Sequence, residues 1–405
     1  MVPNGWNRVT LRDIALINPT KPKRPFNGKV SFVPMDAVSE SATLLRQEER
    51  IYDEVEKGFT SFVDGDVLIA KITPCFENGK GALVYGLING IGFGSTEFHV
   101  LRAKENSVPE YIYYLVNSTE FRVRGEMNMQ GSAGQKRVST DYLRLYKFSV
   151  PSLPEQKKIA QILSTWDKAI TTTEQLLANS QQQKKALMQQ LLTGKKRLLD
   201  ENGVRFSGEW KDIRLKSVLR EVKTRNKDNS IDRVLSVTNH SGFVLPEDQF
   251  SKRVASDDVS NYKVVKKGEY GYNPSRLNVG SFARLDSYEE GLLSPMYVVF
   301  SVNEKILNSD YFMNWMSSNE AKQRISGSTQ GSVRDSVGFD SLCGFPFKLP
   351  PMAEQQKIAA VLSAADQEVT TLQKKLEALK QEKKALMQQL LTGKRRVKID
   401  NKEVA

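Results

Sequence analysis

The feature that most constrains this chain is a twelve-residue run that occurs twice. KKALMQQLLTGK stands at residues 184–195 and again, without a change, at 383–394, which is 199 positions further along. At the same interval VPSLPEQKKIAQIL aligns with LPPMAEQQKIAAVL, and the match continues without a gap to the basic residues after each LLTGK. An internal repeat of this kind constrains the possible architecture more strongly than other sequence features do. The chain is therefore a tandem duplication of one two-part unit, with a period too long for a solenoid.

Upstream of each repeated segment lies a block of about 150 residues in which the two halves share only an outline. Trp6 and Leu11 correspond to Trp210 and Leu215, and FVDGDVLIAKITP corresponds to VVKKGEYGYNPSR. Both blocks contain short β-branched or aromatic runs cut by Gly, Asn and Asp, a pattern typical of strands. We therefore predict a strand-rich domain in each block. One stretch, LKSVLREVKTRNKD, also fits an amphipathic helix that runs into a solvated turn.

The repeated segments have the pattern of long helices. Prolines stand at both starts, and Gly194 and Gly393 follow the last apolar residues, as at a helix start and a C-cap. In the second copy apolar residues recur in a 4-3-4-3 order between 358 and 390, and the first copy repeats this register more weakly between 159 and 191. That spacing is typical of a coiled-coil seam. Since neither seam is buried alone, we predict that two helices, each roughly 57 Å long, pack against each other.

The predicted fold class is α+β, with two strand-rich globular domains in a pseudo-two-fold arrangement joined by two long antiparallel coiled-coil helices. The expected segments are a first domain (called head 1), a first spacer helix, a second domain (called head 2), a second spacer helix and a C-terminal tail. Their predicted bounds are 1–150, 151–198, 199–349, 350–397 and 398–405.

The charge balance indicates an anionic partner. The chain has 59 Lys and Arg against 47 Asp and Glu, a net charge of +12 and a pI near 9.4. An excess of this size favours nucleic acid first and an anionic membrane surface second, and a basic face that meets an acidic protein remains an alternative. The sequence shows no signal peptide and no run of 18 apolar residues, and its two cysteines, Cys75 and Cys343, suit reduced residues. We therefore expect a cytoplasmic protein.

The motifs of most catalytic sites are missing. There is no GxxxxGK[ST] phosphate loop, and ENGKGAL lacks the hydroxyl that would hold magnesium. His99 and His240 are the only histidines, so the chain has very few residues that could bind zinc or act in histidine-based catalysis. Asn273-Pro274 resembles the start of an amino-methyltransferase motif, but Ser275 follows where that motif has a second proline. We expect no catalysis, no metal site and no cofactor in this chain.

Polar and basic residues in Gly-punctuated stretches are the candidates for DNA contact, because Arg, Lys, Asn and Gln reach base edges and Lys, Arg and Ser reach phosphates. In head 1 these are Lys21, Lys23, Arg24, Asn27, Lys29, Gln130, Ser132, Gln135, Lys136 and Arg137. In head 2 they are Lys223, Arg225, Asn226, Lys227, Asn273, Arg276, Ser328, Gln330, Ser332 and Arg334. For each candidate the alternative is an ordinary solvent-exposed loop residue that does not contact DNA. Two loops stand out, because at comparable positions both heads carry Gln-Gly-Ser followed by a basic residue.

The whole pattern resembles the specificity subunit of type I restriction-modification systems. Each half opens on W-x(4)-L, continues through a variable block, closes on P-x(2–3)-EQ-x-x-I-x-x-x-L, and ends in a long helix with LLTGK. The duplicated proline, EQ, helix and LLTGK arrangement is highly specific and spans the chain. One departure is Trp166, which stands opposite Ala365.

The resemblance implies a noncatalytic subunit in which two target-recognition domains read the halves of an asymmetric bipartite DNA target in the major groove. The paired helices would set the gap and dock two methyltransferase subunits, which bring S-adenosylmethionine. Restriction subunits would bring ATP- and magnesium-dependent translocation and cleavage. Residues identical in both copies are our docking candidates, because identical partners dock on identical surfaces: Lys184, Lys185, Met188, Gln189, Gln190, Lys383, Lys384, Met387, Gln388 and Gln389. A recent duplication would explain the same identity.

Two other classes of function remain open on sequence grounds. A duplicated coiled-coil scaffold that bridges two proteins would be basic for unrelated reasons and would show no DNA sequence preference. A standalone methyltransferase or nuclease would be active as a purified chain. Specific DNA binding differs from both, since it weakens log-linearly with added salt and keeps its preference for one duplex.

Overall fold

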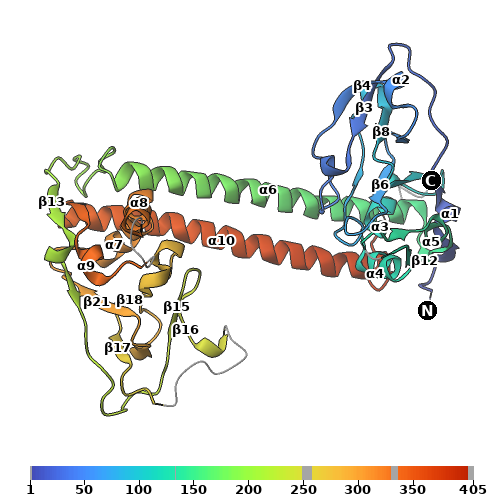
Figure 1. The fold of residues 1–405 in the computed structure, drawn as a ribbon. Coiled ribbons are helices and arrows are strands. Elements are labelled where there is room, and N and C mark those ends of the chain that lie inside the picture. Colours follow the sequence, from blue (N-terminus) through green and yellow to red (C-terminus); the bar gives the residue numbers. More distant parts are fainter. Residues whose placement is uncertain (1, 133, 249–257, 330–335, 400–405) are drawn as a thin grey trace. The chain divides into compact units, whose positions relative to one another are not determined.

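The computed structural model describes residues 2–132, 134–248, 258–329 and 336–399 (Figure 1). The chain separates into two compact units, one formed by 1–174 with 374–405 and the other by 175–373. Two long helices, α6 (Leu153–Leu191) and α10 (Met352–Leu391), each contribute residues to both units. Unit 1 therefore contains head 1, the start of α6 and the end of α10. Unit 2 contains head 2, the end of α6 and the start of α10.

Head 1 is built on two four-stranded sheets. The first has the strand order β2-β9-β6-β7 and is antiparallel throughout. The second has the order β4-β3-β8-β5, with β3 and β8 parallel. The strands of these sheets are β2 (Ala15–Ile17), β3 (Lys29–Val33), β4 (Glu48–Ile51), β5 (Thr60–Val63), β6 (Val67–Ala70), β7 (Gly81–Leu83), β8 (Ile91–Gly94) and β9 (Phe98–Ala103).

Two further ladders, five short α-helices and two 3-10 turns complete the described part of head 1. The ladders pair β1 with β12 and β10 with β11. Their strands are β1 (Asn7–Thr10), β10 (Met129–Gln130), β11 (Arg137–Val138) and β12 (Lys147–Val150). The helices are α1 (Leu11–Ile14), α2 (Tyr52–Val55), α3 (Pro109–Val116), α4 (Thr119–Met127) and α5 (Thr140–Leu145).

Head 2 repeats this plan with fewer paired strands among the described residues. Its four-stranded antiparallel sheet has the order β14-β21-β18-β19, and three two-stranded ladders accompany it. The sheet strands are β14 (Leu219–Glu221), β18 (Tyr270–Tyr272), β19 (Phe282–Arg284) and β21 (Val298–Val302). The ladders are β13 (Lys211–Arg214) with β22 (Pro346–Leu349), β15 (Ser236–Thr238) with β16 (Gly242–Val244), and β17 (Lys263–Lys266) with β20 (Glu290–Leu293). The helices are α7 (Ser309–Met316), α8 (Asn319–Thr329) and α9 (Phe339–Cys343).

The central strand of head 1, β6, has an equivalent in head 2, β18, and the same kind of turn precedes both strands. Gly65 precedes β6 and Gly268 precedes β18, and both have φ +84°, a conformation that glycine adopts without steric cost. The next residue is acidic in each head and caps the turn by accepting a backbone N–H at 2.8 Å, Asp66 from Val63 and Glu269 from Lys266. The sequence match of FVDGDVLIAKITP to VVKKGEYGYNPSR is thus a match of structure. The predicted α+β class with strand-rich heads is confirmed.

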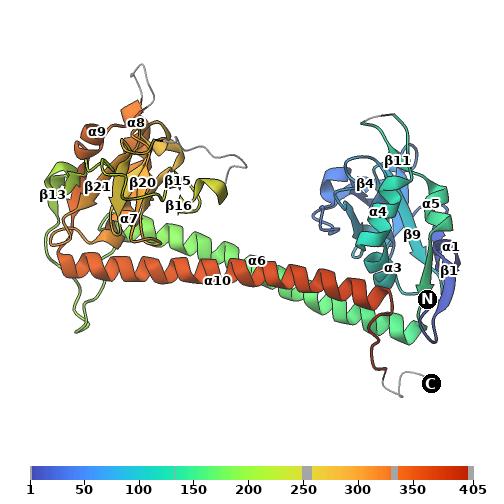
Figure 2. The same cartoon turned by 90° about the horizontal axis from the view of Figure 1, so that it is seen from below.

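The helices pair in antiparallel fashion within each unit (Figure 1 and Figure 2). In unit 1, Asp167 of α6 binds Lys383 of α10 at 2.5 Å, while Glu174, further along α6, binds the earlier Lys380 at 2.7 Å. The predicted seam is visible as a periodic loss of exposure, with Thr173 and Ser180 buried on α6. The expected pair of antiparallel coiled-coil helices is therefore confirmed.

The structure differs from two sequence predictions. The alternative of an amphipathic helix over LKSVLREVKTRNKD is wrong, because Leu219–Glu221 pairs with β21 and only a single 3-10 turn precedes it. The long helices end at Leu191 and Leu391, shortly before Gly194 and Gly393, which both have φ +70°. In the part of the chain that the structure describes, no helix has the length and apolar character to cross a membrane.

Candidate nucleic-acid interface

The strongest candidate loop in head 1 is the hairpin of β10 and β11. Gln130, Ser132, Gln135 and Lys136 are exposed on it, and Arg137 is half-buried at its base. The base of the hairpin is fixed to the segment that follows β6. Lys71 accepts a backbone hydrogen bond from Val138 at 2.8 Å, and Lys136 accepts one from Thr73 at 2.9 Å. The structure thus joins the hairpin to a second loop, 71–80, at the end of the central strand.

Head 2 places its candidate residues on the same framework. The backbone N–H of Val337, at the base of the second Gln-Gly-Ser loop, donates to Pro274 at 3.0 Å. Pro274 lies at the same distance after Gly268 as Lys71 does after Gly65, so this bond is the counterpart of the one in head 1. Arg276 is exposed beside it, and the Asn273 Oδ1 caps the 3-10 turn by accepting from the Ser275 N–H at 3.0 Å. Three predicted residues of this loop, Gln330, Ser332 and Arg334, lie outside the described residues.

Ser328 precedes that loop on α8. Its hydroxyl donates to the backbone oxygen of Arg324 at 2.7 Å. Helix α8 packs against the 3-10 turn that contains Arg276. Asn273 also lies close to the segment before β21, because its amide nitrogen is 3.9 Å from the Met296 sulfur. Helix α8, which carries Ser328 near its end, therefore lies beside the turn that contains Arg276.

The 21–29 segment of head 1 is tied to its own domain. Arg24 forms a bidentate ion pair with Asp53 at 3.0 and 3.1 Å, and Lys29 pairs with Glu49 at 2.8 Å. Lys21 donates to the backbone of Glu56, and the Asn27 Oδ1 accepts from the Asn89 amide at 2.7 Å. Lys23 is exposed, and no interaction of its side chain is found among the described residues. To bind DNA, most of this segment would have to exchange existing partners.

The 223–227 segment of head 2 has a mixed character. Asn226 is 1% exposed, and its amide both donates to and accepts from the backbone of Ile231, at 2.9 and 3.2 Å. Its side chain shapes the turn and reaches a base only if that turn opens. Arg225 donates to the Asn261 backbone at 2.8 Å and Lys223 pairs with Glu221 at 3.1 Å, whereas Lys227 is exposed.

Hydrogen bonding and burial lower the pKa values of two side chains at the base of the head 1 hairpin, Glu97 and His99. The Arg137 guanidinium lowers the pKa of Glu97 from its usual range, chiefly by hydrogen bonding. Burial lowers the pKa of His99, whose Nε2 lies 2.9 Å from the Val138 oxygen and whose Nδ1 lies 3.2 Å from the Asn18 amide. A neutral imidazole in this position links β9 to the hairpin, which gives the loop a rigid support.

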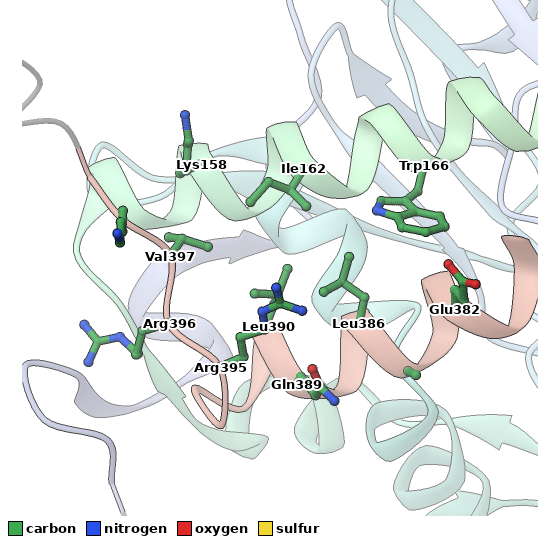
Figure 3. A pocket seen from close by; sticks show the side chains of 12 residues that line it. Lys158, Ile162, Trp166, Glu382, Leu386, Gln389, Leu390, Arg395, Arg396 and Val397 are labelled. Carbon is green, nitrogen blue, oxygen red and sulfur yellow. The ribbon is translucent and has the colours of Figure 1, made fainter.

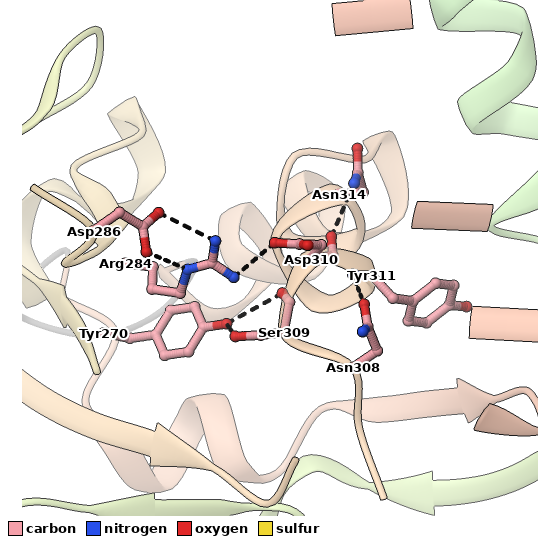
Figure 4. A network of polar contacts seen from close by, with 8 residues as sticks. All are labelled: Tyr270, Arg284, Asp286, Asn308, Ser309, Asp310, Tyr311 and Asn314. Carbon is pink, nitrogen blue, oxygen red and sulfur yellow. Dashed lines mark hydrogen bonds and ion pairs between the residues drawn. The ribbon is translucent and has the colours of Figure 1, made fainter. Parts of the chain in front are cut away.

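In head 2 a polar network connects the sheet to helix α7 (Figure 4). Arg284 on β19 binds Asp286 and Asp310, each at 2.7 Å, and Asp310 lies in the first turn of α7. The Tyr270 hydroxyl hydrogen-bonds Ser309 at the start of the same helix, and burial raises the pKa of Tyr270 to about 12. The network ties the central strand β18 and its neighbour β19 to the start of α7.

Each head is fixed to the long helices by the same three-residue lock. In unit 1 the buried Glu155 of α6 accepts from the Trp6 indole at 3.2 Å and from Arg396 at 2.7 and 2.9 Å. Arg396 comes from the segment after α10. The duplicated EQ motif thus anchors the other copy's helix end.

Unit 2 repeats this lock with Glu354, Trp210 and Arg197. Glu354 accepts from the Trp210 indole at 2.9 Å and from Arg197 at 2.5 and 2.7 Å. Arg197 comes from the segment after α6. Each motif glutamate therefore binds the arginine that follows the opposite long helix.

The glutamine of each EQ motif binds the head instead. The Gln355 Oε1 accepts from the Asn308 N–H at 2.8 Å, and its amide donates to the Ile306 and Pro350 backbone oxygens at 3.0 and 2.9 Å. Gln156 does the same in unit 1, donating to Asn106 and Pro151 at 3.1 Å each. The EQ pair therefore fixes the angle at which each helix leaves its head.

The ten docking candidates do not share one environment. Lys184 and Lys383 lie in the seam and form ion pairs with Asp366 and Asp167. Met188 and Met387 pack partly buried against the apolar cores. The other six are exposed on the helix surface: Lys185, Gln189, Gln190, Lys384, Gln388 and Gln389.

Unit 1 has two hollows beside these helix ends. A cavity of about 640 Å³ has apolar walls that include Ile162, Trp166 and Leu386, with Lys158 and Arg395 also lining it (Figure 3). A larger groove of about 1500 Å³ lies between head 1 and the helices, and its lining includes four docking candidates, Lys383, Lys384, Met387 and Gln388. In unit 2 Ala365 takes the place of Trp166, so the walls of the two units differ.

Comparison with known proteins identifies the family. The model of the type I restriction modification DNA specificity domain matches residues 3–179 and 271–381, more than half of the chain. The chain therefore belongs to the type I restriction-modification DNA specificity family.

Individual relatives agree with this assignment. The EcoEI specificity subunit of a type I restriction enzyme from Escherichia coli is 40% identical over 177 residues, which cover 43% of this chain and 29% of that relative. The EcoAI specificity subunit from the same species is 40% identical over 173 residues and is likewise covered over only 29% of its length. A putative MjaX specificity subunit from Methanocaldococcus jannaschii is 24% identical over 98% of this chain and 95% of its own.

Solved structures share the fold. The HsdS subunit from Thermoanaerobacter tengcongensis has 19% sequence identity and a TM-score of 0.52, over 97% of this chain and 98% of its own. A type I restriction-modification S subunit from M. genitalium has 13% identity and a TM-score of 0.58, over 96% and 99% of the two chains.

Sequence reasoning missed two parts of the candidate interface. The 71–80 loop and Glu97 were not selected in head 1, although Asn273 and Arg276 were selected at the matching place in head 2. The signal was available, because aligning Gly65 with Gly268 sets Lys71 opposite Pro274. Glu97 carried no comparable signal, since its role depends on the pairing of β9 with β6.

Proposed function

We propose that this chain is the DNA sequence-specificity subunit of a type I restriction-modification complex and that each head reads one half of an asymmetric bipartite target. The observation that carries this is the shared framework of the two heads. In both, a Gln-Gly-Ser loop is bonded through its basal valine to the segment after the central strand, at 2.8 Å in head 1 and 3.0 Å in head 2. Family membership and a net charge of +12 support a DNA partner.

The difference between the heads supports unlike half-sites. At the base of the loop, head 1 carries the charged residues Glu97 and Arg137, and head 2 carries Met296 and Ser336 at the positions 199 residues later. Direct readout depends on the donors and acceptors that a side chain offers to a base edge. Two readers with such different side chains would select different base pairs, so the whole target would be asymmetric.

The helices would set the gap between the half-sites and carry the partner subunits. The locks at Glu155 and Glu354 hold each head at a fixed place on its helices, which supports a constant spacing. The six exposed docking candidates are identical in sequence and similarly exposed in both units, as two copies of one methyltransferase subunit would require. In this proposal S-adenosylmethionine binds those subunits, ATP and magnesium bind restriction subunits, and the complex acts in the cytoplasm.

The test is the methylated motif in cells that express this chain with its partner subunits. Long-read sequencing should show one bipartite, asymmetric motif that disappears when this chain is deleted. In vitro, the assembled complex should bind that duplex with a log-linear loss of affinity as salt rises. A complex that assembles but shows no sequence preference at any salt concentration would instead favour a scaffold.

A further inference from the structure

The arginine at the base of the head 1 hairpin is held by a carboxylate from another strand. Arg137 Nε donates to the Glu97 Oε2 at 3.0 Å, and Arg137 Nη2 donates to the Oε1 at 2.8 Å. The third nitrogen, Nη1, donates to the backbone oxygen of Gln135 at 3.0 Å. The Arg137 side chain is still 41% exposed, whereas that of Glu97 is 25% exposed. The carboxylate is thus the inner partner and the guanidinium the outer one.

These contacts leave part of the guanidinium free. Arginine has five N–H donors in a planar fork, one on Nε and two on each terminal nitrogen. Glu97 takes the Nε donor and one Nη2 donor, and Gln135 takes one Nη1 donor. One N–H on each terminal nitrogen therefore has no acceptor among the described residues. Two such donors match the O6 and N7 acceptors of a guanine in the major groove.

The backbone that carries Arg137 is also fixed on several sides. Arg137 forms a β-bridge with Ile72, and its neighbour Val138 donates to Lys71 at 2.8 Å. The His99 Nε2 lies 2.9 Å from the backbone oxygen of Val138, and the Lys71 backbone N–H donates to the backbone oxygen of Glu97 at 2.8 Å. A side chain that is held in one conformation before binding loses less entropy when it binds. Arg137 is therefore preorganised, in contrast with the exposed Lys136 beside it.

On the basis of the function proposed above, we propose that Arg137 reads a guanine in the half-site of head 1 and that Glu97 is its positioning residue. The guanidinium would place its two free N–H donors on O6 and N7 of one guanine. The carboxylate fixes the plane and rotation of the fork, which a lysine at this place could not reproduce. Head 2 has Met296 and Ser336 at the corresponding positions and so lacks this reader.

The proposal is tested in the assembled complex with single substitutions of the two residues. In Arg137→Ala, the preference for guanine at one position of one half-site should fall about 5- to 150-fold, the range of one bidentate base contact. Glu97→Ala should weaken the guanine preference at the same position to a smaller extent. Glu97→Gln keeps a hydrogen-bond acceptor and should therefore retain more of this preference than Glu97→Ala does. In the Arg137→Ala background, Glu97→Ala should add nothing, because the two residues act as one unit.

Arg46→Ala is a matched control, because Arg46 forms an exposed ion pair in the same head, with Asp36 at 2.7 Å, and lies outside the candidate loops. It should leave the motif unchanged. The readouts are the methylated motif in cells, competition binding with all four bases at each position, and thermal melting of each variant. Arg137→Lys keeps the charge and should keep the fold but lose the guanine preference.

Two results would overturn the proposal. If Arg137→Ala weakens binding equally for all sequences and reduces the salt slope by about one, the residue contacts a phosphate. If Arg137→Ala and Glu97→Ala lower only the melting temperature and every position of the motif is retained, the pair is structural. Both results assume that the wild-type complex has a bipartite motif, so failure of the proposed function itself would be seen first, in the wild type.

Discussion

The lock around Glu354 makes a quantitative prediction for Arg197→Ala. The Glu354 side chain is 0% exposed and accepts two hydrogen bonds from Arg197, at 2.5 and 2.7 Å, and one from Trp210 at 2.9 Å. The guanidinium carbon also lies 5.6 Å from the Trp210 ring centroid. Removing Arg197 leaves a fully buried carboxylate with an indole as its one remaining side-chain donor among the described residues.

The expected cost follows from this burial. Breaking a buried ion pair by removing one partner costs about 3–5 kcal/mol. Arg197 is 22% exposed, so water can partly replace it and the lower end, about 3 kcal/mol, applies. That free energy corresponds to a population of locally opened molecules that is roughly 100-fold larger. The opening should involve the start of α10 and the end of α6, which the lock joins in unit 2.

Hydrogen exchange measured by mass spectrometry is the suitable assay, because it reports local opening peptide by peptide. Peptides from the first turns of α10 should exchange roughly 100-fold faster in Arg197→Ala, while peptides from the start of α6, in unit 1, should be unchanged. Arg197→Lys is the matched control, since it keeps the positive charge but loses the bidentate fork, and it should give a smaller acceleration. Arg396→Ala should act on unit 1, with a weaker effect because Arg396 is 44% exposed.

Unchanged exchange at the start of α10 in Arg197→Ala would contradict the reasoning. It would mean that the carboxylate is satisfied without the arginine and that the lock does not hold the helix. Equal acceleration in both units would also contradict it, because the structure confines Arg197 to unit 2.

Three further predictions concern other parts of the molecule. Burial lowers the pKa of His99, so head 1 should lose stability as the pH falls below about 6.5, where the unfolded imidazole takes up a proton first; His99→Gln should flatten this dependence in thermal melts. Lys184→Asp should destabilise unit 2 by about 0.2–1 kcal/mol in urea unfolding, and Asp366→Lys should restore the lost stability by reversing the pair. Lys136→Ala should weaken DNA binding to all sequences alike and reduce the salt slope by about one, and a change of motif would contradict this phosphate role.

The helices were predictable from sequence because their signal is local and periodic. The 4-3-4-3 spacing between 358 and 390 needs one partner face, and the duplication supplies it. Gly194 and Gly393 mark the ends, since the positive φ that each adopts is strained for other residues. The strand-rich character of the heads was equally local, as β5 and β6 within TSFVDGDVLIAKI show.

The arrangement of the locks could not be read from sequence. Trp6, Glu155 and Arg396 each stand in a repeated motif, but nothing in the motifs states that Glu155 binds the arginine of the opposite copy rather than Arg197. That choice follows from the antiparallel packing of two helices. The same packing places Lys383 against Asp167 in the seam, where the repeat alone suggested a docking surface.

The candidate DNA interface was only partly predictable, for a similar reason. Loop residues such as Gln135 and Lys136 can be selected by type and setting. Whether a polar side chain is free depends on partners far along the chain, as with Arg24 and Asp53 or Arg137 and Glu97. Asn226 is the clearest case, because a turn-forming asparagine and a base-reading asparagine look alike until burial is known.

The most direct test of the central claim is the methylated motif after exchange of head 1. Residues 1–150 would be replaced by the corresponding block of a relative, with both long helices and head 2 left intact. The account predicts that one half of the bipartite motif changes while the other half and the gap are retained. Retention of the complete old motif, or a change in both halves at once, would contradict the claim that each head reads its own half-site.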